Sequence, residues 1–303
     1  MRQNYQISEQ FPSDKEEEAL GFPLFARKQY WLLHLEEDFL VPVIIRNQQH
    51  QIIAFWCFYR SVNRLITPFR APFFTPYLLD RDVHIITDVI AFCKMKYNLP
   101  IQFTLKSTLD LRKVMNVIPT LKIIKVELGN EFISLNDSFN EQIESSRKKR
   151  KLKSILFDNA FEISKVAGQD WEEVYEQNLI WRREKKHQDF IKTAEMRKAK
   201  SQFPLSYHAF KLKRNGELIG SAYFLKVDKD LIYVYSLITA PSFASEETSL
   251  LLWKAIFDLA KEEDISTIDM GTSMLADGSI NRSLARYKKF IGGLHYKKYT
   301  FEC

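Results

Sequence analysis

Hydrophobic periodicity in the first half of the chain predicts strands around one amphipathic helix. Segments 39–47 and 51–61 are rich in branched and aromatic residues and flank a polar turn, which predicts a β-hairpin. Apolar residues recur at helical spacing over 80–98, which predicts an amphipathic helix that ends before Pro100. Beyond it we expect a strand at 100–106, a short helix at 108–118 and another strand at 121–128.

The middle of the chain is more polar and reads mainly as helix. Segment 138–154 has only a sparse apolar stripe and predicts one helix, followed by a strand at 160–167. Segment 170–202 predicts one or two long helices, with Asp170 as N-cap. This region separates two stretches that are richer in strands.

The last hundred residues repeat the organisation of the first half. Three strands are expected within 207–239, with a tight turn at Asn215-Gly216. A helix over 244–264 should have Ser245 as its N-cap and Glu246 and Glu247 in its first turn. A strand at 265–273, a basic helix and a final strand at 296–302 follow. The repeated order of meander, helix and strand predicts an α+β protein of two domains, 1–135 and 136–303.

Composition narrows the class of protein. Of the 303 residues, 46% are hydrophobic and 14% aromatic, which is typical of a globular chain with a real core. The three cysteines are scattered and no histidines are paired at metal-binding spacing, so we expect neither disulfides nor a metal site. No secretory leader or long apolar run is evident. A cytoplasmic protein without a membrane span is expected.

The net charge of +6 is spread thinly except for one block. Residues 147–153 carry six basic side chains and no acidic one. Such a block could bind the phosphates of an RNA or a nucleotide. It could equally be the solvated face of a helix, because it lacks the interleaved aromatic residues of single-strand binders.

Three local motifs resemble those of the Fem-type aminoacyltransferases and their acyl-CoA N-acyltransferase (GNAT) relatives. The run Asp269-Met270-Gly271-Thr272-Ser273 resembles their Asp-aromatic-Gly-x-Ser strand end. Tyr287-Lys288 with Gly292 resembles their aromatic-Lys-x-x-aromatic-Gly element. Segment 138–163 resembles the Arg-rich helix that opens their second domain, with Arg150 best aligned.

The resemblance implies two tandem GNAT-like domains, each a mixed, mostly antiparallel sheet flanked by helices. It also implies transfer of an acyl or aminoacyl group to the amine of a small molecule or peptide. Acyl-CoA, an acyl carrier protein or aminoacyl-tRNA would serve as a co-substrate that is not tightly bound. The reaction would take place in the cleft between the domains.

One feature departs from this pattern. GNAT domains grip the CoA pyrophosphate with a Gly-rich loop at the start of a helix. The corresponding segment here, 239–248, contains no glycine and carries Glu246 and Glu247, whose charges would repel a pyrophosphate. Conventional CoA binding is therefore not expected in the second domain.

Each candidate residue has a functional and a structural interpretation. Lys288 could stabilise an oxyanion or hold a donor phosphate, or could lie on the wet face of a helix. Asp269 could orient an amine or act as a base, or could bind backbone N–H groups at its strand end. Gly271, Ser273 and Gly292 could serve turn geometry or a close substrate approach.

Two arginines complete the candidate set for substrate binding. Arg150 belongs to the basic block, and Arg70 lies in a segment, 68–76, whose three prolines predict a shaped loop. The alternative to an enzyme is a non-catalytic GNAT-fold module that binds RNA or a protein partner. A third possibility, a purely structural partner protein, would make no demand on Lys288.

Overall fold

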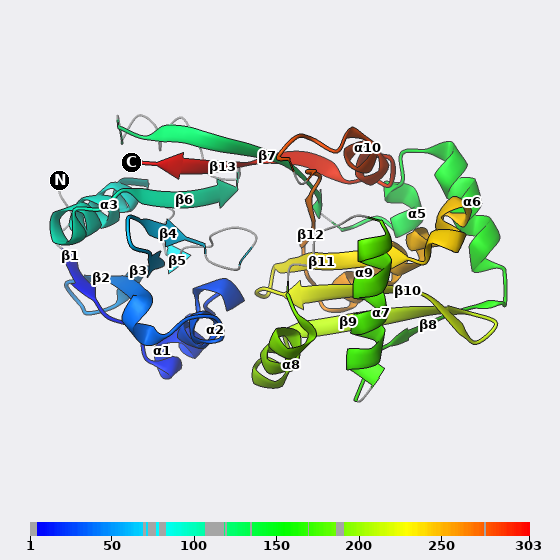
Figure 1. Cartoon of the computed structure of the whole chain (residues 1–303), viewed down its shortest axis with the longest axis horizontal. Helices are drawn as coiled ribbons and strands as arrows, with labels where there is room; N and C mark the ends of the chain where they lie inside the picture. Colours follow the sequence, from blue (N-terminus) through cyan, green and yellow to red (C-terminus); the bar gives the residue numbers. More distant parts are fainter. Residues whose placement is uncertain are drawn as a thin grey trace. The chain divides into compact units, whose positions relative to one another are not determined.

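The computed structural model describes most of the chain (Figure 1). The described residues are 5–68, 71, 77–78, 83–106, 118, 120–133, 135–168, 170–185, 191–275 and 277–303. They group into two compact units, of which unit 1 comprises residues 1–127 and 297–303 and unit 2 comprises 128–296.

The described residues form thirteen strands of a mixed sheet, together with helices. The strands are β1 (Tyr5–Glu9), β2 (Leu40–Asn47), β3 (Ile52–Arg60), β4 (Leu65–Thr67), β5 (Tyr77–Leu78), β6 (Ile101–Lys106), β7 (Lys122–Ile133), β8 (Phe161–Lys165), β9 (Tyr207–Arg214), β10 (Glu217–Lys226), β11 (Leu231–Thr239), β12 (Thr267–Thr272) and β13 (Leu294–Glu302). The α-helices are α1 (Asp14–Ala19), α2 (Lys28–Leu32), α3 (Val83–Tyr97), α5 (Phe139–Gln142), α6 (Ser146–Leu156), α7 (Asp170–Glu184), α8 (Thr193–Gln202), α9 (Ser249–Glu262) and α10 (Arg282–Phe290). Short 3₁₀ helices are η1 (Leu24–Ala26), η2 (Glu37–Phe39) and η3 (Pro241–Glu246).

Most of the predicted elements are confirmed. The first hairpin is β2 and β3, and the amphipathic helix is α3. Asn215 and Gly216 both have positive φ, as the tight turn between β9 and β10 requires. The predicted helix 108–118, apart from residue 118, and the candidate Arg70 lie outside the described residues.

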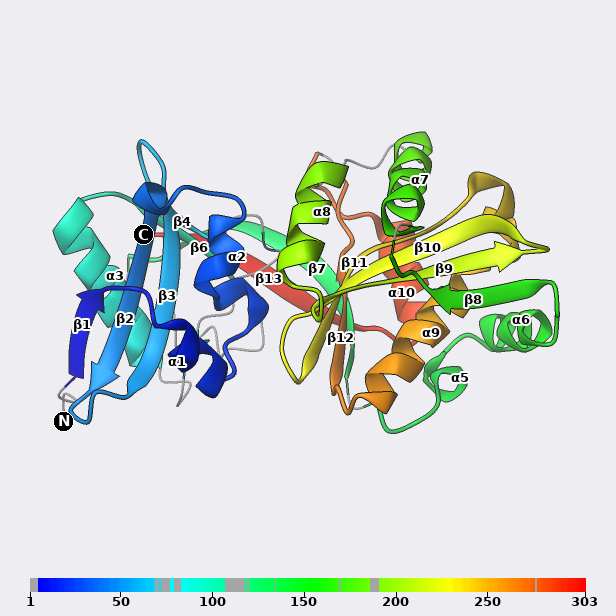
Figure 2. The same cartoon turned by 90° about the horizontal axis from the view of Figure 1, so that it is seen from below.

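Unit 1 is built on a meander followed by a parallel crossover. Its strand order is β1-β2-β3-β4-β6-β13-β7, and β5 also pairs with β3. Strand β4 leads through α3 into β6, which pairs with β4 in parallel. Figure 2 shows α3 on one side of β2 and β3 and α1 and α2 on the other. The core beneath α3 is apolar and includes Trp56, Phe58 and Phe103.

Unit 2 repeats the arrangement. Its strand order is β13-β7-β12-β11-β10-β9-β8, and β11 leads through α9 into β12, which is parallel to β11. Helix α9 buries its apolar stripe against this sheet, and α7 covers the opposite face (Figure 2). Strands β7 and β13 contribute residues to both units, since the unit limits fall at 127/128 and 296/297.

Two helix predictions need correction. The helix expected over 138–154 is broken into α5 and α6, because Ile143 is extended and Ser145 caps a new helix through its side chain. The helix expected from Ser245 begins at Ser249, with Thr248 in the N-cap position. Its first turn therefore contains no acidic residue, and Glu247 precedes it in a left-handed conformation.

Candidate active site

The parallel strands β11 and β12 stay paired over only part of their length. Register pairs join Leu231, Ile232 and Tyr233 to Thr267, Ile268 and Asp269. Beyond Tyr233 and Asp269, β11 continues to Thr239 and β12 to Thr272 without further register pairs between them. Ligands of α/β sheets bind beyond the carboxyl ends of parallel strands, so the place where this pairing ends is the natural location for a site in unit 2.

A β-bulge at Tyr235 changes which face of the sheet the following residues cover. Tyr223 pairs with Ser236 and Phe224 with Val234, so Tyr235 is the extra residue of β11. Before the bulge, Val234 packs in the core beneath α9. After it, Ser236 faces α7 and donates a hydrogen bond to the side-chain oxygen of Asn178 at 2.8 Å. The bulge therefore bends β11 just beyond the end of its pairing with β12.

Asp269 is completely buried and fixes the end of β12. One carboxylate oxygen accepts a hydrogen bond from the backbone N–H of Gly271 at 2.8 Å. The Tyr296 hydroxyl on β13 lies 2.8 and 2.9 Å from the two carboxylate oxygens. Burial and the Asp269 charge raise the pKa of Tyr296 well above its ordinary value, so it remains a donor at neutral pH. The backbone contact is the one that the structural interpretation of Asp269 expected.

Lys288 is buried rather than lying on the wet face of α10. Its ammonium group donates hydrogen bonds to the carbonyl oxygens of Gly271 at 2.9 Å and Thr272 at 3.2 Å. Burial lowers the pKa of Lys288 to about 8, although the Asp269 charge acts to raise it. Its neighbour Lys289 is exposed. One helix thus presents one lysine to the strand end and the next to solvent.

Glycines allow the backbone to approach closely around this cluster. Gly271 has a φ of +74°, and Gly292 has a φ of +101°. A Cβ atom on Gly292 would lie 2.3 Å from the carbonyl oxygen of Gln142. A Cβ atom on Gly129 would lie 2.2 Å from the Tyr296 ring. Gly292 therefore allows α5 to pack against the end of α10, and Gly129 leaves room for the tyrosine that binds Asp269.

Two buried polar groups near the strand ends have open hydrogen-bonding capacity. The Ser273 hydroxyl and the side-chain oxygen of Asn130 have no hydrogen-bond partner within the described part of the chain. The Ser273 backbone is held on both sides, since its N–H donates to Leu128 and its carbonyl accepts from Asn281. Buried polar groups are normally paired, so both atoms are candidates for ligand contacts.

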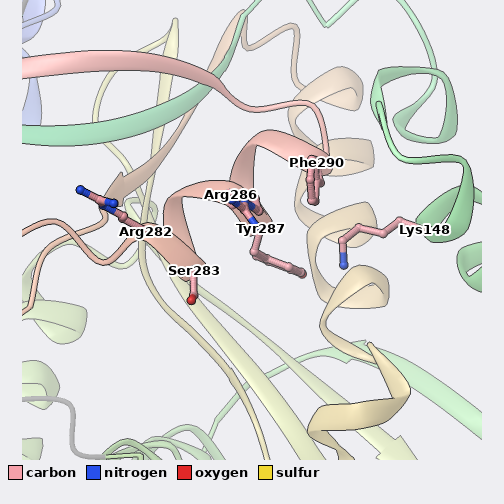
Figure 3. Close-up of a pocket in the computed structure, with 6 residues that line it drawn as sticks. All are labelled: Lys148, Arg282, Ser283, Arg286, Tyr287 and Phe290. Atoms are coloured by element: carbon pink, nitrogen blue, oxygen red, sulfur yellow. The ribbon is translucent and has the colours of Figure 1, made fainter.

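A basic pocket of about 380 Å³ lies along α10 (Figure 3). It is lined by Lys148, Arg282, Ser283, Arg286, Tyr287 and Phe290. Figure 3 shows Lys148 reaching from α6 toward the Tyr287 ring, and its ammonium group lies 4.7 Å from the ring centroid. Arg150 is exposed on α6 and does not line this pocket.

A carboxylate of the chain itself, that of Glu247, lies at the amino end of α9. Glu247 forms an ion pair with Lys148 at 3.1 Å. Next to it, the Ser249 hydroxyl lies 2.8 Å from the Tyr287 hydroxyl and links α9 to α10. A carboxylate and a tyrosine thus occupy the surroundings in which a GNAT domain would place pyrophosphate.

Sequence reasoning brought together Asp269, Gly271 and Lys288, which the structure joins in one hydrogen-bonded cluster. It missed Tyr296, which was expected only as part of a closing strand, and it treated Lys148 only as one member of the basic block. The sequence around Tyr296, with His295 before it and Lys297 after it, carried no signal of a buried carboxylate 27 positions earlier.

No protein-family model and no curated protein matches the sequence. Solved structures match in fold. The crystal structure of FemX aligns over 98% of this chain and 96% of its own, with a TM-score of 0.73 and 7% identity. A tandem GNAT protein from the clavulanic acid biosynthesis pathway aligns over 99% and 98%, with a TM-score of 0.57 and 10% identity.

L-PGS from Bacillus licheniformis aligns over 97% of this chain and 92% of its own, with a TM-score of 0.57 and 12% identity. At these identities the likeness shows the fold alone. The chain has a Fem-like, tandem GNAT-type fold, as the sequence motifs predicted. Within the described residues, no helix is long and apolar enough to cross a membrane.

Proposed function

We propose that this protein is an N-acyltransferase or aminoacyltransferase with two tandem GNAT-like domains. The observation that carries the proposal is the buried cluster of Asp269, Tyr296 and Lys288, which lies where the parallel pairing of β11 and β12 ends. Buried titratable groups beyond the carboxyl ends of parallel strands are typical of a functional site. FemX and the tandem GNAT protein share this fold, which supports the same class of activity.

The proposed reaction is direct attack of an amine on an activated acyl group. The amine nitrogen bonds to the carbonyl carbon of a thioester or ester and gives a tetrahedral intermediate with a negatively charged oxygen. Collapse breaks the carbon–sulfur or carbon–oxygen bond. The proton lost by the amine ends on the departing thiolate or alkoxide, so that an amide and a thiol or alcohol are formed.

Lys288 supplies the positive charge for this chemistry in our proposal. Its ammonium group is buried, and two of its three N–H bonds donate to the strand-end carbonyls. A charge held in such a low-dielectric place stabilises a developing oxyanion more than a solvated charge would. Asp269 and Tyr296 act as positioning residues that hold Gly271, and Gly271 with Ser273 borders the substrate.

The acceptor in this proposal is an amine of a small molecule or peptide. The donor classes are acyl-CoA, a carrier-bound acyl group and aminoacyl-tRNA. The carboxylate of Glu247 beside α9 argues against a conventional pyrophosphate grip at that helix end. It therefore favours donors whose phosphates are held elsewhere.

The test compares the acyl-transfer rates of two variants at neighbouring lysines of α10. Purified protein is incubated with each donor class and a panel of amines, and the amide product is measured by mass spectrometry. Lys288→Met should lower the transfer rate by at least about a hundredfold, the usual loss of one oxyanion contact, while Lys289→Met should retain it. Equal rates in both variants, each folded by circular dichroism, would remove Lys288 from the proposal.

The second candidate is a non-catalytic module that binds RNA or a protein partner. The observation that favours it is the same carboxylate at the end of α9, which departs from the helix end that acyl-CoA enzymes use. Salt-dependent RNA binding with no amide product from any donor would select this alternative.

A further inference from the structure

We infer that the basic pocket on α10 binds the phosphate of a nucleotide-bearing ligand. The inference deepens the proposed function, because the ligand would be the nucleotide part of the acyl donor. Only the identification of the ligand as part of the acyl donor rests on the proposed function. Phosphate binding itself is inferred from the residues of the pocket.

The first support is uncompensated charge. Arg282 and Arg286 lie one helical turn apart on α10, line the pocket and form no ion pair with any described residue. Guanidinium groups match phosphate oxygens through two parallel hydrogen bonds. Lys148 also lines the pocket, but it is buried and its charge is paired with that of Glu247, so the uncompensated charge is that of the two arginines.

The second support is an aromatic surface beside the cations. Phe290, the last residue of α10, lines the pocket and is 39% exposed, so its ring is accessible to a ligand. Tyr287 forms another part of the wall (Figure 3). A nucleobase can stack on the exposed Phe290 ring while its phosphate contacts an arginine. Rings and cations together fit a nucleotide better than they fit an inorganic anion.

The third support is the way in which the α9 end is closed. In this chain Glu247 places a carboxylate before α9, where the helix dipole favours a negative charge. The same carboxylate pairs with Lys148 of the pocket. Ligand phosphate and Glu247 therefore compete for one ammonium group, and the phosphate site is displaced from the amino end of α9 onto α10.

The ligand chemistry has two possible sources, a coenzyme and an RNA end. The exposed arginines of α6, Arg147 and Arg150, form no ion pair with a described residue and extend the basic surface from the helix that carries Lys148. Contacts with these arginines, beyond the pocket, would therefore strengthen the binding of a polynucleotide more than the binding of a single coenzyme.

The experiment measures binding directly. Desulfo-coenzyme A, which cannot donate an acyl group, and a short fluorescent single-stranded RNA are titrated against the whole protein. We expect Arg282→Gln/Arg286→Gln to weaken binding of the preferred probe at least about tenfold. If the probe is RNA, the dependence of log affinity on log salt should also fall by about 0.7 for each phosphate that the variant no longer neutralises.

Two further variants make the test specific. Lys15→Gln/Lys198→Gln removes two exposed charges on α1 and α8 and should leave affinity unchanged. Glu247→Gln should raise affinity about fivefold, because it removes the competing carboxylate. Wild-type affinity in the double arginine variant, or no binding of either probe to the wild type, would overturn the inference that this pocket binds phosphate.

The outcome is separable from the fate of the proposed function. Binding that depends on the arginines but gives no amide from any donor would uphold the pocket and contradict transfer. Amide formation that is unchanged in the double arginine variant would uphold transfer and contradict the pocket.

Discussion

The Lys288 side chain combines burial with a positive charge, and this combination predicts a pH effect on stability. Its pKa is lowered to about 8 in the folded protein, against an ordinary value of 10.5. Between these values the unfolded chain binds more protons than the folded one, so stability rises as pH increases. Below about pH 8 both states are protonated, and the full penalty for burying the charge is present.

We therefore expect the free energy of unfolding of wild type to rise relative to Lys288→Met by about 1 kcal/mol between pH 7 and pH 9. Urea unfolding of both proteins at the two pH values measures the difference. Comparison with the variant cancels the contributions of the other titrating groups. A constant difference across this range would show that the lysine is not desolvated.

The Tyr296 hydroxyl serves both oxygens of a buried carboxylate, so its loss should be costly. Tyr296→Phe should lower the free energy of unfolding by about 1–3 kcal/mol, since a buried charged acceptor loses a donor. A double-mutant cycle with Asp269→Asn measures the coupling, which should be about 1 kcal/mol or more. Additive effects of the two substitutions would contradict the contact.

At the scale of elements, glycines decide how closely α5 and α10 pack. Gly292 has a positive φ and faces the backbone of Gln142, whereas Gly278 has a positive φ and nothing within 4 Å of its Cβ position. Gly278→Ala should cost about 1–2 kcal/mol for backbone strain alone. Gly292→Ala should cost at least about 2 kcal/mol more because of the clash. Denaturant unfolding of the two variants compares them, and equal losses would contradict the close packing.

Elements with strong periodicity were predictable, and elements set by distant contacts were not. The hairpin β2–β3 and the helix α3 have clear patterns and are found where expected. The start of α9 was misplaced because Ser245, Glu246 and Glu247 form a good local capping signal. The ion pair between Glu247 and Lys148 accompanies a different local conformation, and no local pattern encodes that partner.

The candidate site was predictable only in part, for the same reason. The motif around Asp269 pointed to the strand end where the buried cluster lies, because the type and spacing of its residues are local. The contact of Lys288 with Gly271 spans 17 positions across a loop and α10, so the sequence left its side chain open to two interpretations. The place of these residues in the sequence does not by itself define their roles, and the same holds for Arg150.

At the scale of the whole molecule, the two units share a plan of meander, crossover helix and parallel strand pair. What hydrophobic periodicity could not show is that β7 and β13 contribute residues to both units. Strand pairing across many residues leaves no local signal, since each strand has the same alternating pattern whatever its partner. The proposed function places acyl transfer at β11 and β12 of unit 2.

The central claim is that this protein makes an amide from an activated acyl donor. The most direct measurement is mass spectrometry of amine mixtures incubated with wild-type protein and acyl-CoA, carrier-bound acyl or aminoacyl-tRNA donors. We predict that at least one donor class yields an amide faster than its uncatalysed reaction. An absence of enzyme-dependent amide from every donor class, with protein that remains folded, would contradict the account.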